Sequence, residues 1–258
     1  MRTTRHGLTR IAGGAVELLW KPDLLHTVYL GVIDNAFDWA TLFLDAEGLT
    51  SDFDLQWVNL PSYHNWTPPN KPFQAVQKWT GKEMRRWSKA LLVVFSVVLK
   101  AALDPSGPHR DRIAKAGGIG GAKDRYKQAI RCLRGLIQFS LMGLYPSHTP
   151  STLEYMEKYL NDFHDNKSVF LEFRVTAGIK KKAEKVRMRL RGAFARATDY
   201  PADTEEEIRA YRLTPEEKIE IESAVEEFSL GLAHFNYPKI HYLTHFTKYI
   251  QKFGPLND

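Results

Sequence analysis

The stretch WTGKEMRRWSKALLVVFSVVLKAALDP, residues 79 to 105, contains the start, the apolar face and the end of one helix. Thr80 and Glu83 have the spacing of a capping box, in which the two side chains bind free backbone N–H groups at the helix start. Pro105 ends the helix after Asp104, because proline has no N–H group to donate. The apolar residues between these signals predict that the helix lies in the core of the protein.

The most apolar part of this helix, residues 90 to 103, is too short to span a membrane. A spanning helix needs roughly 20 apolar residues, and this shorter stretch also includes Lys100. The N-terminus has no long apolar core of the kind found in signal peptides. A single cysteine, Cys132, favours a reducing compartment. We expect a protein that is not secreted, has no membrane partner, and is located in the nucleus or otherwise in the cytoplasm.

Apolar residues recur every three or four positions in much of the remaining chain, which is the spacing of an amphipathic helix. This pattern predicts helices from Leu25 to about Gly48 and from Lys123 to Leu144. Thr149 with Pro150, and Thr214 with Pro215, mark two further helix starts, since proline suits the first helical position. These helices are expected to reach about Phe170 and His234.

A few segments interrupt the helical pattern. Residues 15–20 and 53–60 have the length and composition of short β-strands. Residues 60–73, rich in proline and aromatic side chains, are expected to form a packed surface loop. Residues 104–123 resemble a flexible connection. Their glycines match neither of two phosphate-binding motifs, GxxxxGK[ST] and GxGxxG. The sequence therefore predicts a mainly α fold with at most one or two short strands.

The pattern divides the chain into four parts. Residues 1–14 are basic and expected to be poorly ordered, and residues 15–173 are expected to form a helical core. Residues 174–213 are a charged segment, basic and then acidic. Residues 214–258 are expected to form C-terminal helices that pack on the core.

Charge is distributed in blocks along the chain, whose formal net charge is +6. Residues 174–196 contain nine Lys or Arg and one acid, whereas residues 199–227 contain eleven acids and three bases. The basic block could bind a nucleic-acid backbone by releasing counterions, act as a nuclear import signal, or pair with the neighbouring acidic block. For the first alternative, the DNA-binding candidates are Lys180, Lys181, Lys182, Lys185, Arg187, Arg189 and Arg191.

Asp23 and His26 stand one helical turn apart, between the expected strand at 15–20 and the helix from Leu25. Carboxylates at such a junction often hold metal ions in nuclease-like folds. Alternatively, Asp23 caps the helix, where the macrodipole stabilises a negative charge, and His26 is only its neighbour. Asp34 is expected about 16 Å further along the helix, too far for the roughly 4 Å spacing of a two-metal centre.

His241 and His245 have the spacing that lets two imidazoles bind one metal ion, although the glutamate of the HExxH motif is absent. The alternative is a pair of hydrogen-bonded histidines. Cys132 has no sequence feature of a reactive thiol.

Four blocks occur in the order found in Plavaka-type transposases: PDLLHTVYLGV, WTGKEMRRW, YPSHTPSTLEYMEKYLNDFHDNKSVF and PKIHYLTHFTKYIQKFG. Over roughly residues 15 to 256, the chain resembles this family of the Kyakuja-Dileera-Zisupton group. The resemblance is weakest across the glycine-containing segment and residues 174–213. It implies a fragment of a ribonuclease-H-like catalytic domain, whose helices correspond to the helical insertion after the second acid. Asp23 then corresponds to that second acid, with His26 beside it, and Mg²⁺ or Mn²⁺ would serve a full-length family member.

The chain departs from the family pattern in lacking an earlier strand with the first acid and a later glutamate-rich segment with the third. A two-metal centre needs several carboxylates to hold both ions. We therefore expect a transposable-element-derived fragment that is inactive alone, needs no cofactor, has no evident small-molecule substrate and retains DNA binding. The alternative is an all-α protein-interaction module that self-associates, or binds the remainder of a transposase, and has no nucleic-acid role.

Overall fold

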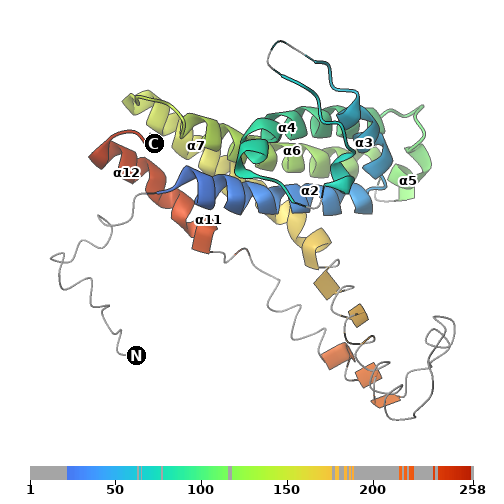
Figure 1. Ribbon diagram of the computed structural model, residues 1–258. Helices are drawn as coiled ribbons and strands as arrows, with labels where there is room; N and C mark the ends of the chain where they lie inside the picture. Colours follow the sequence, from blue (N-terminus) through green and yellow to red (C-terminus); the bar gives the residue numbers. More distant parts are fainter. Residues whose placement is uncertain are drawn as a thin grey trace.

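The computed structural model describes residues 22–175 except 63, 65, 77, 116 and 117, scattered positions from 178 to 223, residue 235, and residues 238–256. Within this part, the chain is helical and contains no β-strand. The long helices α4 (Gly81–Ala102) and α6 (Gly118–Met142) run side by side, and α7 (Pro150–Asn166) packs against α6 (Figure 1). The prediction of a mainly α fold is confirmed.

The first helical segment consists of the π-helix η2 (Leu24–Ile33) and the α-helix α2 (Asp34–Ala46), joined without a break. The apolar positions on its predicted inner face are all buried: Val28, Val32, Ala36, Trp39, Ala40 and Phe43. The segment ends at Gly48, as predicted. Gly48 has a φ of 58°, a left-handed conformation that glycine adopts at little cost.

The prediction of a strand at residues 53–60 is wrong, because the helix α3 (Thr50–Val58) covers most of this stretch. In a strand, Leu55 would share a face with Phe53 and Trp57. Phe53 and Trp57 are 0% exposed, whereas Leu55 is 58% exposed. The burial therefore follows the helical period of four, and the apolar residues of this short run face the core from a helix.

The loop between α3 and α4 is packed against the core, as predicted. It contains the short 3₁₀ helix η3 (Phe73–Ala75), in which Phe73 is buried. The Phe73 ring lies 5.0 Å from the Trp57 ring, and the Trp66 ring lies 5.3 Å from the Trp87 ring of α4. Aromatic contacts therefore fix the loop on α3 and α4.

The capping box predicted at the start of α4 is present. The Glu83 backbone N–H donates to Thr80 Oγ1 at 3.3 Å, and the Thr80 N–H donates to Glu83 Oε2 at 2.8 Å. Thr149 and Thr152 form an equivalent box at the start of α7, with Pro150 in the first turn. Local sequence signals thus set the starts of both helices.

Much of the segment 104–123, predicted to be a flexible connection, is helical. It contains the helix α5 (Arg110–Lys115) and the first turn of α6, which begins at Gly118 and not at Lys123. Ile113 and Ala122 are 2% and 0% exposed. Burial of these two apolar residues in the core stabilises helices that their glycine-rich surroundings do not favour.

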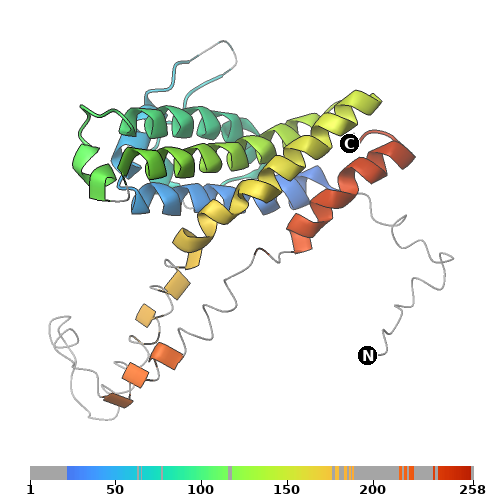
Figure 2. The same cartoon turned by 180° about the vertical axis from the view of Figure 1, so that it is seen from behind.

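The C-terminal elements pack on the opposite end of the body from α5. They are α11 (Pro238–Tyr242), the 3₁₀ turn η5 (Leu243–His245) and α12 (Phe246–Phe253), and they lie beside η2 and α7 (Figure 2). Their apolar side chains enter the common core: Ile240, Leu243, Phe246 and Ile250. A 3₁₀ turn, η4 (Lys167–Phe170), follows α7 and places Phe170 in the same core.

Several predictions concern residues outside the described part. These are the basic segment 1–14 and the strand at 15–20. The helix predicted from Thr214 is described only at scattered positions, which are helical: 215, 216, 218, 219 and 221–223.

Candidate nucleic-acid interface

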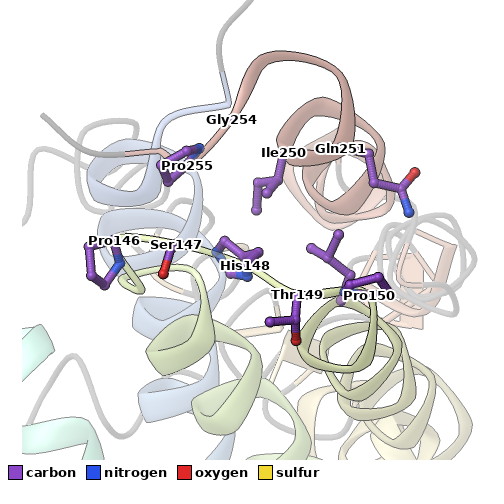
Figure 3. A pocket seen from close by; sticks show the side chains of 10 residues that line it. Pro146, Ser147, His148, Thr149, Pro150, Ile250, Gln251, Gly254 and Pro255 are labelled. Carbon is purple, nitrogen blue, oxygen red and sulfur yellow. The ribbon is translucent and has the colours of Figure 1, made fainter.

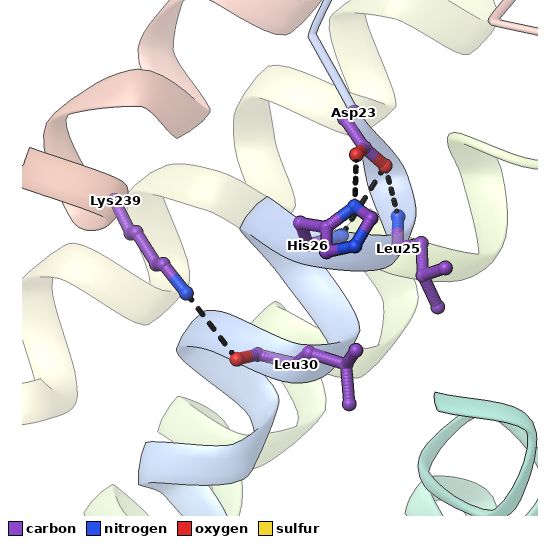
Figure 4. A network of polar contacts seen from close by, with 5 residues as sticks. All are labelled: Asp23, Leu25, His26, Leu30 and Lys239. Atoms are coloured by element: carbon purple, nitrogen blue, oxygen red, sulfur yellow. Dashed lines mark hydrogen bonds and ion pairs between the residues drawn. The ribbon is translucent and has the colours of Figure 1, made fainter. Parts of the chain in front are cut away.

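Asp23 is the N-cap residue of η2. Its Oδ1 accepts hydrogen bonds from the backbone N–H groups of Leu25 at 2.7 Å and His26 at 3.2 Å. Its Oδ2 pairs with Nδ1 of the His26 ring (Figure 4). Partial burial raises the pKa of Asp23, but the hydrogen bonds from the His26 ring and the two N–H groups outweigh it, so the pKa lies below its usual value.

This geometry is that of a helix cap. Both carboxylate oxygens of Asp23 are already bound, one to backbone donors and one to the imidazole. A metal ion at Asp23 would compete with the His26 ring for Oδ2. In the described part of the chain, no group of three or more His, Cys, Asp or Glu side chains has the arrangement of a metal site.

Lys239 connects the C-terminal elements to the same segment. Its side chain lies over Gly31, where a β-carbon would be 2.6 Å from Lys239 Cδ. The Nζ atom donates to the backbone O of Leu30 at 3.3 Å (Figure 4). Burial raises the pKa of Asp34, the first residue of α2, and the positive charges of Lys239 and Lys78 partly offset this effect.

The structure brings His241 and His245 together. Their Nε2 atoms are 3.3 Å apart, and the ring planes are nearly perpendicular at 83°. His241 is exposed and His245 is partly buried. The two rings therefore form a hydrogen-bonded pair, which is one of the two arrangements expected from their spacing.

The seven bases proposed for DNA binding, from Lys180 to Arg191, all lie outside the described residues. The structure instead shows a second concentration of positive charge, on α4 and α6. These two helices contain ten Lys or Arg residues and only two acids, Glu83 and Asp124. Their excess of positive charge is larger than the +6 of the entire chain.

Eight of these bases are exposed, and we call them the basic face: Lys82, Arg85, Lys89 and Lys100 on α4, and Lys123, Lys127, Arg131 and Arg134 on α6. At 100° per residue, the four on α6 fall within an arc of about 80° and the four on α4 within about 60°. Both helices bury their other sides in one core and contact each other, so each row of bases points outward from that core.

Within the part of the chain that the structure describes, the bases of the basic face make no ion pair with a carboxylate. The two remaining bases of these helices are occupied. Arg86 lies over the Trp87 ring at 4.8 Å, and Arg125 pairs with the buried Glu47 at 2.7 Å. Glu83 closes the capping box. The basic face is therefore free to bind an anionic partner.

Asp23 stands at one end of the basic face. The Leu25 side chain occupies the space beside Gly81 at the start of α4, and Leu24 lies 2.8 Å from the position of a β-carbon on Gly143, just after α6. The start of η2 is therefore next to the start of α4 and the end of α6.

The basic face was not recognised in the sequence, because its two halves are separated by the segment 101–122 and no run of consecutive bases marks them. The signal that could have revealed it is the spacing of bases by three or four residues within each helix, at 82, 85 and 89 and at 123, 127, 131 and 134. This spacing places side chains on one helical face.

A pocket of about 450 Å³ lies between the loop before α7 and the end of α12 (Figure 3). Pro146, His148 and Leu153 line one side, and Ile250 and Pro255 the other. The Nε2 atom of His148 is buried without a hydrogen-bond partner. Burial lowers the pKa of His148, which favours the neutral form of the ring.

Cys132 is fully buried, and its thiol lies 3.8 Å from the backbone O of Phe163. Burial raises its pKa well above the usual range for a thiol, which suppresses the reactive thiolate.

A comparison with models of protein families, with curated proteins and with solved structures found no match. Among the described helices, none has the length and apolar character needed to cross a membrane.

Proposed function

We propose that this chain is a DNA-binding helical part of a transposable-element-derived protein that resembles Plavaka-type transposases. The observation that carries the proposal is the basic face of α4 and α6. On α6, the row from Lys123 to Arg134 is about 16 Å long. A DNA duplex presents one negative charge per about 1.7 Å of its axis, so a row of this length can follow several phosphates.

The basic face suits a phosphate backbone more than a specific base sequence. Its eight charged groups are long, exposed side chains on two helices. Each phosphate that they neutralise releases counterions, which supplies affinity that is independent of base sequence. We therefore propose that the basic face positions DNA, and that any preference for a base sequence comes from other parts of the protein.

The four blocks that carry the transposase resemblance lie close together in the fold. They are far apart in the sequence, yet η2, the start of α4, the start of α7 and α11–α12 meet at one end of the body. The start of η2 contacts Gly81, and Lys239 contacts Leu30.

We propose further that the chain does not cleave DNA alone. Asp23, which by resemblance is the second catalytic acid, uses both oxygens to cap η2 and to hold His26. In a full-length family member, Mg²⁺ or Mn²⁺ would be held by Asp23 together with acids from other segments. The basic block at 180–191 remains a second DNA-binding candidate and a nuclear import candidate.

The test is fluorescence anisotropy with a labelled DNA duplex at increasing salt. The variant K127A/R131A/R134A removes three charges from the basic face, and the control K71A/K248A/K252A removes three exposed charges elsewhere. We expect the basic-face variant to reduce the slope of log affinity against log salt by about 3, and the control to leave it nearly unchanged.

The same titration discriminates the alternatives. If the slope of log affinity against log salt decreases only when the bases of residues 180–191 are neutralised, the chain binds DNA through that block and not through the basic face. Absence of DNA affinity at physiological salt, combined with self-association that weakens as salt increases, would favour the protein-interaction module. Metal-dependent cleavage of DNA that is abolished by D23A would overturn the proposal that the chain is inactive alone.

A further inference from the structure

The two histidines on the C-terminal elements have an unusual mutual geometry. His241 in α11 and His245 at the end of η5 face each other through their Nε2 atoms at 3.3 Å. The elements that carry them are anchored by Leu243 of η5, which is 0% exposed, and Ile240 of α11, which is 4% exposed. The backbone that carries both rings is therefore held by the core, while the facing nitrogen atoms remain near the surface.

We propose that His241 and His245 bind a divalent transition-metal ion, Zn²⁺ in particular, through their Nε2 atoms. Zinc binds histidine nitrogen at about 2.0–2.1 Å in tetrahedral geometry, which requires two ligand nitrogens to be about 3.4 Å apart. The observed separation of 3.3 Å already matches this requirement. The separation of the nitrogens therefore needs little change, although each ring must tilt so that both Nε2 lone pairs point at the ion.

The chemistry of the pair favours this class of metal. Neutral imidazole is a preferred ligand for Zn²⁺, Cu²⁺ and Ni²⁺, whereas Mg²⁺ and Ca²⁺ prefer oxygen ligands. For both Nε2 atoms to donate a lone pair, each ring must carry its proton on Nδ1, which points away from the partner ring. Metal binding therefore replaces one N–H···N hydrogen bond and releases no proton from neutral rings.

The site leaves coordination positions for other ligands. Two imidazoles fill half of a tetrahedral shell, and water or a group from a binding partner completes it. We therefore expect weaker binding than at a closed four-ligand structural site. The inference is independent of the proposed DNA binding, because neither histidine belongs to the basic face.

The experiment is a titration of the purified full chain, free of any affinity tag, with Zn²⁺ by calorimetry and with Co²⁺ by visible absorption. We expect one ion per chain, and a Co²⁺ spectrum with imidazole ligation. Either H241A or H245A should abolish saturable binding at concentrations that half-saturate the unaltered chain. Because His241 is exposed, H241A is expected to keep the fold, which circular dichroism verifies.

His64 supplies the matched control, since it is also an exposed histidine but has no histidine partner among the described residues. H64Q should bind Zn²⁺ as the unaltered chain does. Three results would overturn the inference: no saturable binding by the full chain, binding that survives both H241A and H245A, or binding lost in H64Q. In NMR spectra, the Nε2 chemical shifts of His241 and His245 should change when Zn²⁺ is added, whereas those of the His148 ring should not. This result would support the inference.

Discussion

Gly135 of α6 lies directly against the backbone of Tyr159 in α7. A β-carbon at Gly135 would be 2.6 Å from the Tyr159 carbonyl oxygen and 2.7 Å from the Phe163 nitrogen. Both are backbone atoms, which cannot move aside as the end of a flexible side chain can. The close approach of α6 and α7, the most extensive helix pair in the body, therefore depends on the absence of a side chain at this position.

We expect G135A to lower the free energy of unfolding by about 2 to 3 kcal/mol, because the added methyl group pushes the two helices apart. Its control is G121A in the same helix, where a β-carbon meets nothing within 4 Å. G121A should raise stability by about 0.5 kcal/mol, since alanine favours the helix. Urea denaturation measures both, and equal effects of the two substitutions would contradict the role assigned to Gly135.

Two substitutions of Asp23 separate its role as a helix cap from the effect of its negative charge. D23A should cost about 1 kcal/mol of stability, because the N–H groups of Leu25 and His26 lose their acceptor. D23N removes the negative charge but keeps an oxygen acceptor, so its stability should change by only a few tenths of a kcal/mol. Thermal unfolding compares the two, and a D23N variant as unstable as D23A would show that the contact with His26 matters more than the cap.

His148 should make the protein less stable in acid. Burial places its folded-state pKa below the usual 6.5. The unfolded state therefore binds more protons, and stability falls as the pH decreases through about 6.5. H148Q, which does not titrate, should show a smaller difference in unfolding free energy between pH 7 and pH 5. Since His164 has the same direction of shift, part of the dependence should persist in H148Q and decrease further in H148Q/H164Q.

Glu83 should also contribute to the loss of stability in acid, because its pKa is lowered in the folded state. The backbone hydrogen bond from Thr80, and then the one from the Thr80 hydroxyl, hold the pKa of Glu83 below its usual 4.5. Its contribution is present above that pH and is lost as the pH falls through the folded-state value. E83Q should therefore flatten the acid limb of the stability curve below about pH 4.5. T80A should cost about 1 kcal/mol at neutral pH, as expected for a lost cap.

Helix starts were the most predictable part of the fold. The capping box at Thr80 and Glu83, the proline start at Pro150 and the stop at Gly48 are local chemistry, and each is present where the sequence indicated it. The prediction of a strand at 53–60 was wrong because a short apolar run fits both the period of a strand and that of a helix. Only the exposure of Leu55, which depends on the rest of the fold, decides between them.

The candidate site was less predictable than the fold. Asp23 was placed correctly at a helix start, but sequence alone left capping and metal binding open, and the contacts that fill both oxygens are visible only in three dimensions. The basic face depends on α4 and α6 lying side by side, which their sequences do not state. The pairing of His241 with His245 could be predicted from the sequence, because residues four positions apart meet on one turn of a helix.

The contact between Lys239 and Leu30 joins residues 209 positions apart in the chain. During synthesis, η2 leaves the ribosome long before Lys239 exists, and its surface at Gly31 has no cover until then. Contacts of such long sequence separation slow folding, although the entropy of closing the loop grows only with the logarithm of its length. The helix η2 is thus completed only after the C-terminal elements have been made, and truncation before Lys239 should yield a chain that aggregates through the uncovered end of its core.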